Sequence, residues 1–263
     1  MNLRNELFKC EQSIRMQAKI KDLARSLFSM LGFEISKKLK CINSLRHSVV
    51  RPLATYSPWR TDVQFQQTYK IIQPYTLVDQ YRCYELWCLV EQSSKLCGGN
   101  IIEIGVWRGG TGALIAKRAQ ESGIPGEVFL CDTFAGLVKV GARDPSYKGG
   151  EHANASRQVV EKLMKEMDLE NVKLLEGIFP DQTGSEVEHL QFRFCHIDVD
   201  VYQSAHDIMA WIWKKIVRGG IVVYDDYGFS SCSGITQYVN EQIPCKDRIV
   251  IHNLNGHAVI IKL

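Results

Sequence analysis

Ile101-Ile-Glu-Ile-Gly-Val-Trp-Arg-Gly-Gly-Thr111 is the stretch from which the fold of this protein can be inferred. Its isoleucines are β-branched and suit a buried parallel strand. The glycines that follow permit a tight turn with close backbone approach to a ligand, because glycine adopts left-handed backbone angles without steric cost. We expect a helix over residues 113–121, with its free N–H groups pointing back at the turn. The stretch therefore predicts a strand, a ligand-binding turn and a helix in succession.

The charge of this turn limits the classes of ligand that it could bind. No Gly-Lys-Ser/Thr follows it, and the glycines at 105, 109 and 110 lack the Gly-x-Gly-x-x-Gly spacing of a dinucleotide fold. Glu103 would repel a pyrophosphate but suits a ligand with a positive amine or sulfonium, and S-adenosylmethionine carries both. The alternative is that Glu103 pairs with a nearby basic side chain and that the glycines serve only the turn.

The composition of the 263 residues fits one catalytic domain with an appendage. No apolar run approaches the roughly 20 residues of a membrane span, and the first ten residues lack the apolar core of a signal peptide. The nine cysteines are odd in number and form no Cys-x-x-Cys pair, so we expect them to be reduced. These features predict a cytoplasmic protein.

The N-terminal segment differs from the rest in charge. Residues 1–52 contain eleven basic and four acidic residues, so they carry +7 and the remainder −4. Residues 1–40 have the pattern of an amphipathic helix, for which packing against the domain or a second subunit is favoured over a membrane surface. We expect a helical extension and linker over 1–60, a catalytic domain over 61–263, and a homo-oligomer. A nucleic-acid partner is not expected, because no basic patch with stacking aromatic residues accompanies the glycine turn.

Strands and helices alternate after the glycine turn. Further strands are expected at 128–132, 172–175, 192–197 and 221–224, and helices at 77–96 with Thr76 as cap, 153–167 and 203–216. Asn255-Gly256 between two alternating runs predicts a C-terminal antiparallel hairpin. The pattern predicts a Rossmann-like, doubly wound α/β sheet of about seven strands, mostly parallel, with ligands at the carboxyl ends of the strands.

Two features lie at this carboxyl edge. Asp132 ends the second strand, where an acid commonly binds ribose hydroxyls; alternatively, it only caps the turn at Thr133. Residues 134–152 have no periodicity and many turn formers, so we expect a lid over the acceptor substrate. Its polar residues either recognise that acceptor or are simply solvated, and they include Lys139, Arg143, Tyr147 and Lys148.

Four carboxylates follow two strands that should be neighbours, namely Asp198, Asp200, Asp225 and Asp226. Crowded carboxylates oppose one another's ionisation unless a cation is present. Oxygen ligands favour a hard ion, with Mg²⁺ first and Mn²⁺ or Ca²⁺ as alternatives. Each Asp could instead cap a helix or a turn.

Five ordered motifs resemble the macrocin O-methyltransferase family of class I S-adenosylmethionine-dependent methyltransferases. The motifs are Glu103-Ile-Gly-Val-Trp-Arg-Gly-Gly110, Asp132-Thr-Phe-Ala-Gly136, Glu176-Gly-Ile-Phe-Pro180, Asp198-Val-Asp-Val-Tyr-Gln-Ser204 and Gly219-Gly-Ile-Val-Val-Tyr-Asp-Asp-Tyr227. The similarity spans about residues 70–245. It implies a metal-dependent enzyme that methylates a hydroxyl of a sugar or glycosylated natural product.

The resemblance also implies roles for individual residues. Asp198, Asp225 and Asp226 would bind Mg²⁺, and adenine would lie near 176–178. The general base would be Asp200, or else His152, whose imidazole is the more usual base near neutral pH. The residues expected at S-adenosylmethionine are Thr76, Glu103, Gly105, Val106, Arg108, Gly109, Thr111, Asp132, Thr133, Glu176, Gly177, Ile178 and Asp198.

Two other functions compete with this hypothesis. Asp198-Val-Asp200 alone could be the Asp-x-Asp of a nucleotide-sugar glycosyltransferase, but Glu103 disfavours a diphosphate and the second acidic pair has no role there. The chain could also bind S-adenosylmethionine without catalysis, although the intact acids argue against that.

Overall fold

The computed structural model describes residues 47–50 and 54–263. The chain divides into two units, Met1–Val49 and Val50–Leu263, and the helices and strands given below all belong to the second. The helical extension expected over residues 1–40 lies outside the described residues.

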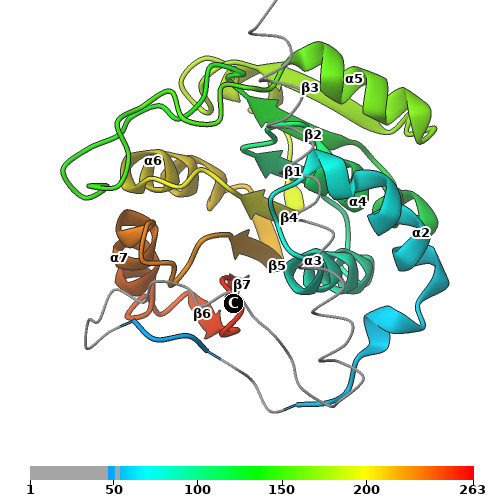
Figure 1. The fold of residues 1–263 in the computed structure, drawn as a ribbon, viewed down its shortest axis with the longest axis horizontal. Coiled ribbons are helices and arrows are strands. Elements are labelled where there is room, and N and C mark those ends of the chain that lie inside the picture. The colour runs from blue at the N-terminus through cyan, green and yellow to red at the C-terminus, as the bar shows by residue number, and fades with distance from the viewer. Residues whose placement is uncertain (1–46, 51–53) are drawn as a thin grey trace, which may run out of the picture. The chain divides into compact units, whose positions relative to one another are not determined.

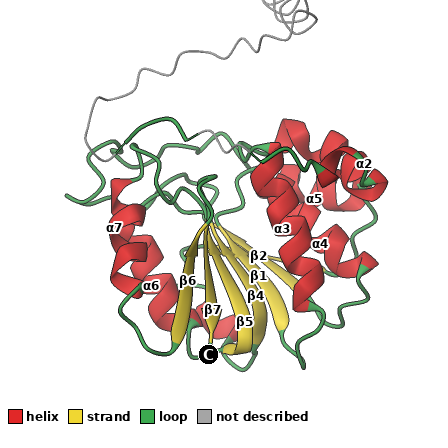
Figure 2. Ribbon diagram, turned by 90° about the horizontal axis from the view of Figure 1, so that it is seen from below, coloured by secondary structure: helices red, strands yellow, loops and turns green. Residues whose placement is uncertain are grey.

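The centre of the second unit is a seven-stranded sheet in the order β3-β2-β1-β4-β5-β7-β6 (Figure 2). Neighbours from β3 to β5 are parallel, whereas β7 is antiparallel to both β5 and β6. The predicted doubly wound sheet with a C-terminal hairpin is thus confirmed. The strands are β1 (Asn100–Ile104), β2 (Val128–Asp132), β3 (Val172–Glu176), β4 (Phe192–Ile197), β5 (Ile216–Tyr224), β6 (Arg248–His252) and β7 (Ala258–Lys262).

Helices cover both faces of the sheet (Figures 1 and 2). One face carries α2 (Val63–Ile72), α3 (Gln80–Ser93), α4 (Gly110–Glu121) and α5 (Arg157–Glu166), and the other carries α6 (Tyr202–Ile212) and α7 (Ser233–Gln242). Each face has its own apolar core, one around Trp87 and Leu114 and the other around Phe192 and Ile208. Short 3₁₀ helices occur at η1 (Pro58–Arg60), η2 (Gln73–Tyr75) and η3 (Gly184–Val187).

Several element boundaries differ from the expected ones. Helix α3 begins at Gln80 rather than near residue 77, because the side chain of Asp79 accepts the N–H bonds of Tyr81 and Arg82. Thr76 is therefore not its cap. Strand β5 begins at Ile216 rather than at the expected residue 221, so it includes Arg218-Gly-Gly220, and its pairing with β4 contains a register shift. Helices α2 and α7 were not predicted, whereas α5 and α6 occur but are shorter than expected.

The long loop between β2 and α5 contains no helix or strand, as expected. It runs beside α6 (Figure 1). Ser204 Oγ on this helix donates to the carbonyl of Val138 in the loop at 3.2 Å. Within the described part of the chain, no helix has both the length and the apolar composition needed to cross a membrane.

Candidate active site

A cavity of about 360 Å³ opens at the carboxyl ends of β1, β2, β4 and β5. This position matches the rule that open α/β sheets bind ligands where the strand order reverses, here between β1 and β4. Its volume lies within the usual range for small-molecule sites, roughly 300–1,000 Å³. The expected residues that line it are Thr76, Gly105, Val106, Thr111, Asp132, Thr133, His152, Gly177, Ile178, Asp198, Asp200, Asp225 and Asp226.

Gly105 lies where the carboxyl ends of the parallel strands β1 and β4 approach each other. Its φ is +88°, and a Cβ atom there would be 1.7 Å from the carbonyl oxygen of Asp198. Asp198 N–H in turn donates to the carbonyl of Ile104 at 2.9 Å. Glycine is therefore required for the approach of the β4 end to the β1 end, and not only for the approach of a ligand.

Asp132 organises the glycine turn while facing the cavity. Its Oδ2 accepts the N–H bonds of Val106 and Trp107 at 2.7 and 2.8 Å, and its Oδ1 accepts the N–H of Phe134 at 2.7 Å. The carboxylate thus caps the turn, as one sequence interpretation allowed. It also lines the cavity, as the ribose-binding interpretation requires.

Glu103 does not reach the cavity, which corrects the expectation that it faces the ligand. The side chain is fully buried, and its Oε1 lies 2.8 Å from Nδ1 of His196 on β4. A Cβ atom on Gly112 would lie 2.7 Å from Glu103 Oε2, so the carboxylate is wedged beneath α4. The cause is strand alternation: Glu103 precedes the strand's last residue and points into the layer between sheet and helix.

Three more expected cofactor residues lie away from the cavity lining. Arg108 stacks on Trp107 and donates to the carbonyl of Asn154. Gly109 packs against Val160 of α5, and a Cβ atom added to Gly109 would lie 3.0 Å from Cγ1 of Val160. The carboxylate of Glu176 is exposed and lies 3.7 Å from Arg157, although its neighbours Gly177 and Ile178 do line the cavity.

Asp198, Asp225 and Asp226 converge as expected: each offers an oxygen within 4.8 Å of the others. Burial raises the pKa of Asp198 and of Asp226, and the neighbouring carboxylates raise both further. Two buried acids whose ionisation is unfavourable, beside a third carboxylate and with oxygen donors only, fit a hard divalent cation.

Asp225 is held by two basic residues that the sequence did not single out. Arg82 of α3 forms an ion pair with it, and Nε2 of His257 lies 3.1 Å from its Oδ1. Burial alone would raise the pKa of Asp225, but His257 and Arg82 hold it well below its usual range. Neither Arg82 nor His257 lies in a recognisable motif. The fold brings residues 82, 225 and 257 together from distant parts of the sequence.

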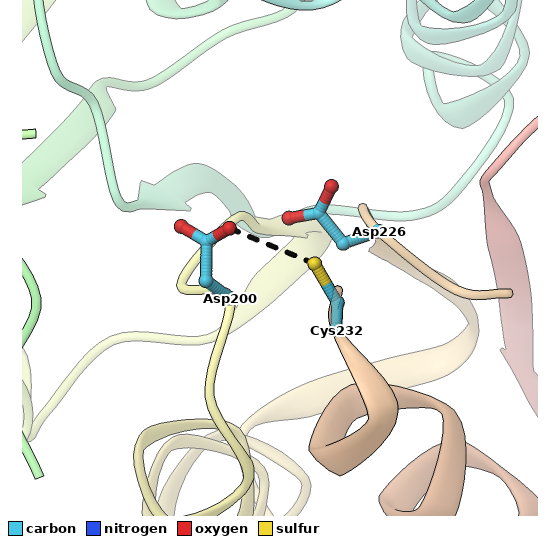
Figure 3. Close-up of side chains that lie close together, drawn as sticks. All are labelled: Asp200, Asp226 and Cys232. Carbon is cyan, nitrogen blue, oxygen red and sulfur yellow. Dashed lines mark hydrogen bonds between the residues drawn. The ribbon is translucent and has the colours of Figure 1, made fainter. Parts of the chain in front are cut away.

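The two candidate bases differ in surroundings. Asp200 is partly buried and accepts a hydrogen bond at 2.7 Å from the hydroxyl of Tyr147. Figure 3 shows it beside Asp226 and Cys232, whose Sγ lies 3.8 Å from Asp200 Oδ1. His152 is exposed on the loop but also lines the cavity.

The polar loop residues separate into two kinds. Lys139 pairs with Asp181 and Asp207, both at 2.7 Å, and Arg143 stacks on Tyr202. These cations hold the loop in place and do not line the cavity. Tyr147, by contrast, lines the cavity.

Comparison with protein families gives one match over most of the described chain. The family model for macrocin O-methyltransferase matches residues 59–253. Among curated proteins, a Streptomyces olivaceus 8-demethyl-8-(2,3-dimethoxy-alpha-L-rhamnosyl)-tetracenomycin-C 4'-O-methyltransferase is 27% identical over 51% of this chain and 55% of its own length. The Streptomyces niveus demethyldecarbamoylnovobiocin O-methyltransferase is 28% identical over 62% of this chain and 61% of its own. The chain thus spans less than two thirds of these relatives.

Solved structures share the fold. The O-methyltransferase NovP has a TM-score of 0.63 at 24% identity, covering 72% of this chain and 82% of its own. The calicheamicin methyltransferase CalS11 has a TM-score of 0.59 at 15% identity, covering 79% and 94%. At these identities the likeness concerns the fold alone.

Proposed function

This chain belongs to the macrocin O-methyltransferase family, and from this premise we propose that it is a metal-dependent O-methyltransferase. The methyl donor is S-adenosylmethionine, and the acceptor is a hydroxyl of a sugar or glycosylated natural product. The observation that carries the proposal is a single cavity lined both by the Asp132 turn and by the three converging carboxylates. A methyl donor and an activated hydroxyl must meet in this way.

The donor would lie over the carboxyl ends of β1 and β2. Asp132 lines the cavity, and its carboxylate would accept hydrogen bonds from ribose hydroxyls. Gly177 and Ile178 also line the cavity and would flank an adenine ring. Thr76 reaches the same cavity because η2 crosses the start of α4, where a Cβ on Gly110 would lie 2.7 Å from the Tyr75 backbone. S-adenosylmethionine carries its methyl group on a sulfonium. When the methyl group is transferred, the sulfur leaves as a neutral thioether.

Asp198, Asp225 and Asp226 would hold the divalent ion, with Mg²⁺ as the expected species. When bound, such an ion lowers the pKa of an acceptor hydroxyl and fixes its oxygen. Arg82 and His257 keep Asp225 ionised and oriented. The charge of the three acids is thus partly balanced before any ion arrives.

Asp200 would take the acceptor proton, because it lies at the cavity between the carboxylates and α6. His152 is the alternative base. In either case the proton leaves the acceptor oxygen for the base as the oxygen–methyl bond forms and the sulfur–methyl bond breaks. A positioned base typically contributes a factor of about 10² to 10⁴ in rate.

The acceptor class is proposed from the relatives, whose names specify methylation of a rhamnosyl tetracenomycin and of a novobiocin precursor. An apolar edge of the cavity supports an acceptor that carries an apolar group beside its sugar. Leu77 and Phe229 line the cavity, and 66% and 39% of their surfaces are exposed. An exposed apolar patch beside a polar site is typical of a ligand groove.

Calorimetric titration tests the proposal first. The full chain is titrated with S-adenosylmethionine and with UDP-sugars, each in Mg²⁺ and in EDTA, and is then assayed against a panel of glycosylated acceptors that includes demethyldecarbamoylnovobiocin. We expect micromolar binding of S-adenosylmethionine alone and methyl transfer that EDTA abolishes. Binding of UDP-sugars instead would favour the glycosyltransferase alternative, and donor binding without transfer to any acceptor would favour a non-catalytic binder.

A further inference from the structure

The loop between β2 and α5 delivers one side chain to the candidate base. Tyr147 is partly buried, and its hydroxyl lies 2.7 Å from Asp200 Oδ1 and 3.2 Å from Cys232 Sγ. Asp200 and Cys232 stand at the starts of α6 and α7, and Figure 3 shows their side chains facing each other. The tyrosine therefore meets the base from a third, separate segment of the chain.

The loop is fastened three residues before this tyrosine. Asp144 is only 2% exposed, and its Oδ1 accepts the N–H of Tyr202 at 2.9 Å at the start of α6. The same oxygen also lies against Gly234 of α7, because a Cβ atom added to Gly234 would be 1.9 Å from Asp144 Oδ1. The backbone then turns, with Tyr147 N–H donating to the carbonyl of Asp144 at 3.1 Å. Two helix starts thus fix the position from which Tyr147 reaches the site.

The hydrogen bond has a fixed direction. Burial raises the pKa of Tyr147, and the contacts with Cys232 and Asp200 raise it further, so the phenol is protonated and donates at neutral pH. Tyr147 and Cys232 both contact Oδ1 of Asp200. Neither Tyr147 nor Cys232 contacts the other oxygen, Oδ2.

We propose that Tyr147 is a positioning residue, which holds Asp200 through Oδ1 so that Oδ2 faces the acceptor. The inference rests on the proposed function. It means that the loop does more than cover the cavity: the base is correctly oriented only when the loop is seated, because a charge-assisted O–H···O⁻ bond connects the two. The acceptor should therefore be deprotonated only under a closed loop.

A matched pair of variants tests this role. Tyr147→Phe removes the hydroxyl that contacts Asp200, and Tyr202→Phe removes a hydroxyl that contacts the carboxylate of Glu241, also at 2.7 Å, outside the cavity. We expect Y147F to lower kcat about 10-fold, with KM and S-adenosylhomocysteine affinity within two-fold of wild type. The Y202F control should retain wild-type kcat. Equal kcat values for the two variants would overturn the role.

The route through Asp200 is tested by combining variants. In an Asp200→Asn background, Y147F should lower kcat less than two-fold, because the group that the tyrosine positions has lost its charge. A full 10-fold loss in that background would show that Tyr147 acts elsewhere, and the inference would be wrong.

Hydrogen exchange of the full chain, without acceptor, separates this inference from the proposed function. Backbone amides of residues 137–150 should exchange faster in Y147F than in wild type, and those of Y202F should not change. If wild type methylates no acceptor of the panel, the proposed function fails, and exchange alone decides whether Tyr147 fastens the loop to Asp200. Equal exchange in Y147F and Y202F would contradict the inference even if methyl transfer is found.

Discussion

The carboxylates that line the cavity differ in the groups that surround them. Asp132 is surrounded by three backbone N–H donors, whereas Asp198 and Asp226 face other acids. Burial and neighbouring negative charge disfavour the ionised forms of Asp198 and Asp226 and raise the pKa of both. Residues of the same type at one edge of the sheet are thus suited to different ligands, a neutral polar ribose and a cation.

Replacement of Asp132 by Ala should weaken S-adenosylmethionine binding by about 10- to 100-fold, because the turn loses its acceptor and the ribose loses a partner. One lost hydrogen bond to a charged group is worth roughly 1.5–3 kcal/mol, and about 1.4 kcal/mol corresponds to a tenfold change in affinity. Calorimetry measures the affinity. The control is Glu166→Ala at the exposed end of α5, which should bind as wild type does. Unchanged affinity in Asp132→Ala would remove Asp132 from the donor site.

Without a metal ion, the Asp226→Asn variant should be more stable than wild type, and the difference should grow as pH rises. The raised pKa of Asp226 means that the folded state keeps this proton more tightly than the unfolded chain. Above the unfolded pKa of about 3.9, ionisation therefore costs wild type stability that the variant does not lose. Asn also tolerates the positive φ of +63° at this position.

Melting temperatures in EDTA between pH 5 and 8 check this prediction. The variant should gain on wild type by roughly 2–4 °C, about 1 kcal/mol for a domain of this size. In Mg²⁺ the order should reverse, because the wild type gains a ligand that the variant binds poorly. A variant that melts below wild type at pH 8 in EDTA would contradict the repulsion argument.

At the scale of elements, the site depends on how closely the ends of β1 and β4 approach. Asp198 N–H donates to the carbonyl of Ile104, and Gly105 leaves room for the carbonyl of Asp198. This contact places Asp198, the first of the three converging carboxylates, beside the turn that Asp132 caps. A neighbouring contact, between Arg82 of α3 and Asp225 after β5, connects the helical layer to the same group.

Gly105→Ala should lower the free energy of unfolding by about 3 kcal/mol or more. Its Cβ atom would overlap the Asp198 carbonyl at 1.7 Å, so the two strand ends must separate. Gly123→Ala is the matched control, because Gly123 also has a positive φ but no atom lies within 4 Å of its would-be Cβ. The control should lose only the left-handed strain, roughly 1–2 kcal/mol. Urea unfolding measures both, and equal losses would refute the close-approach argument.

At the scale of the whole molecule, both apolar clusters formed by the described residues lie within the second unit. Both apolar clusters are built from residues between Phe65 and Ile260, and the family match begins at residue 59. We therefore propose that residues 61–263 are the catalytic domain. The first 60 residues are proposed as an extension that supports a homo-oligomer.

A fragment beginning at Val50 should fold and bind S-adenosylmethionine like the full chain. Its free energy of unfolding should lie within about 1 kcal/mol of the full-length value, since the fragment keeps every core residue that the structure describes. Light scattering on both proteins tests the extension, and we expect the larger assembly only with residues 1–49 present. A fragment that is unfolded, or a tenfold weaker affinity, would make the extension part of the domain.

Local sequence determined the succession of the strands, that of the helices other than α2 and α7, and the edge at which the site lies. Alternating apolar runs, Asn255-Gly256 and acids after strand ends are local signals, and each depends on backbone preferences that neighbouring residues set. The convergence of Asp198, Asp225 and Asp226 could be predicted for the same reason, because neighbouring parallel strands end at one edge.

Only the tertiary structure decided which residues face the cavity and which partners they have. Glu103 looked like a ligand residue, but its place in the pleat directs it to His196 instead. Arg82, Tyr147 and His257 reach the acidic group from segments without motifs. Long-range packing sets such contacts, and packing depends on the shape of both partners, which no single stretch of sequence encodes.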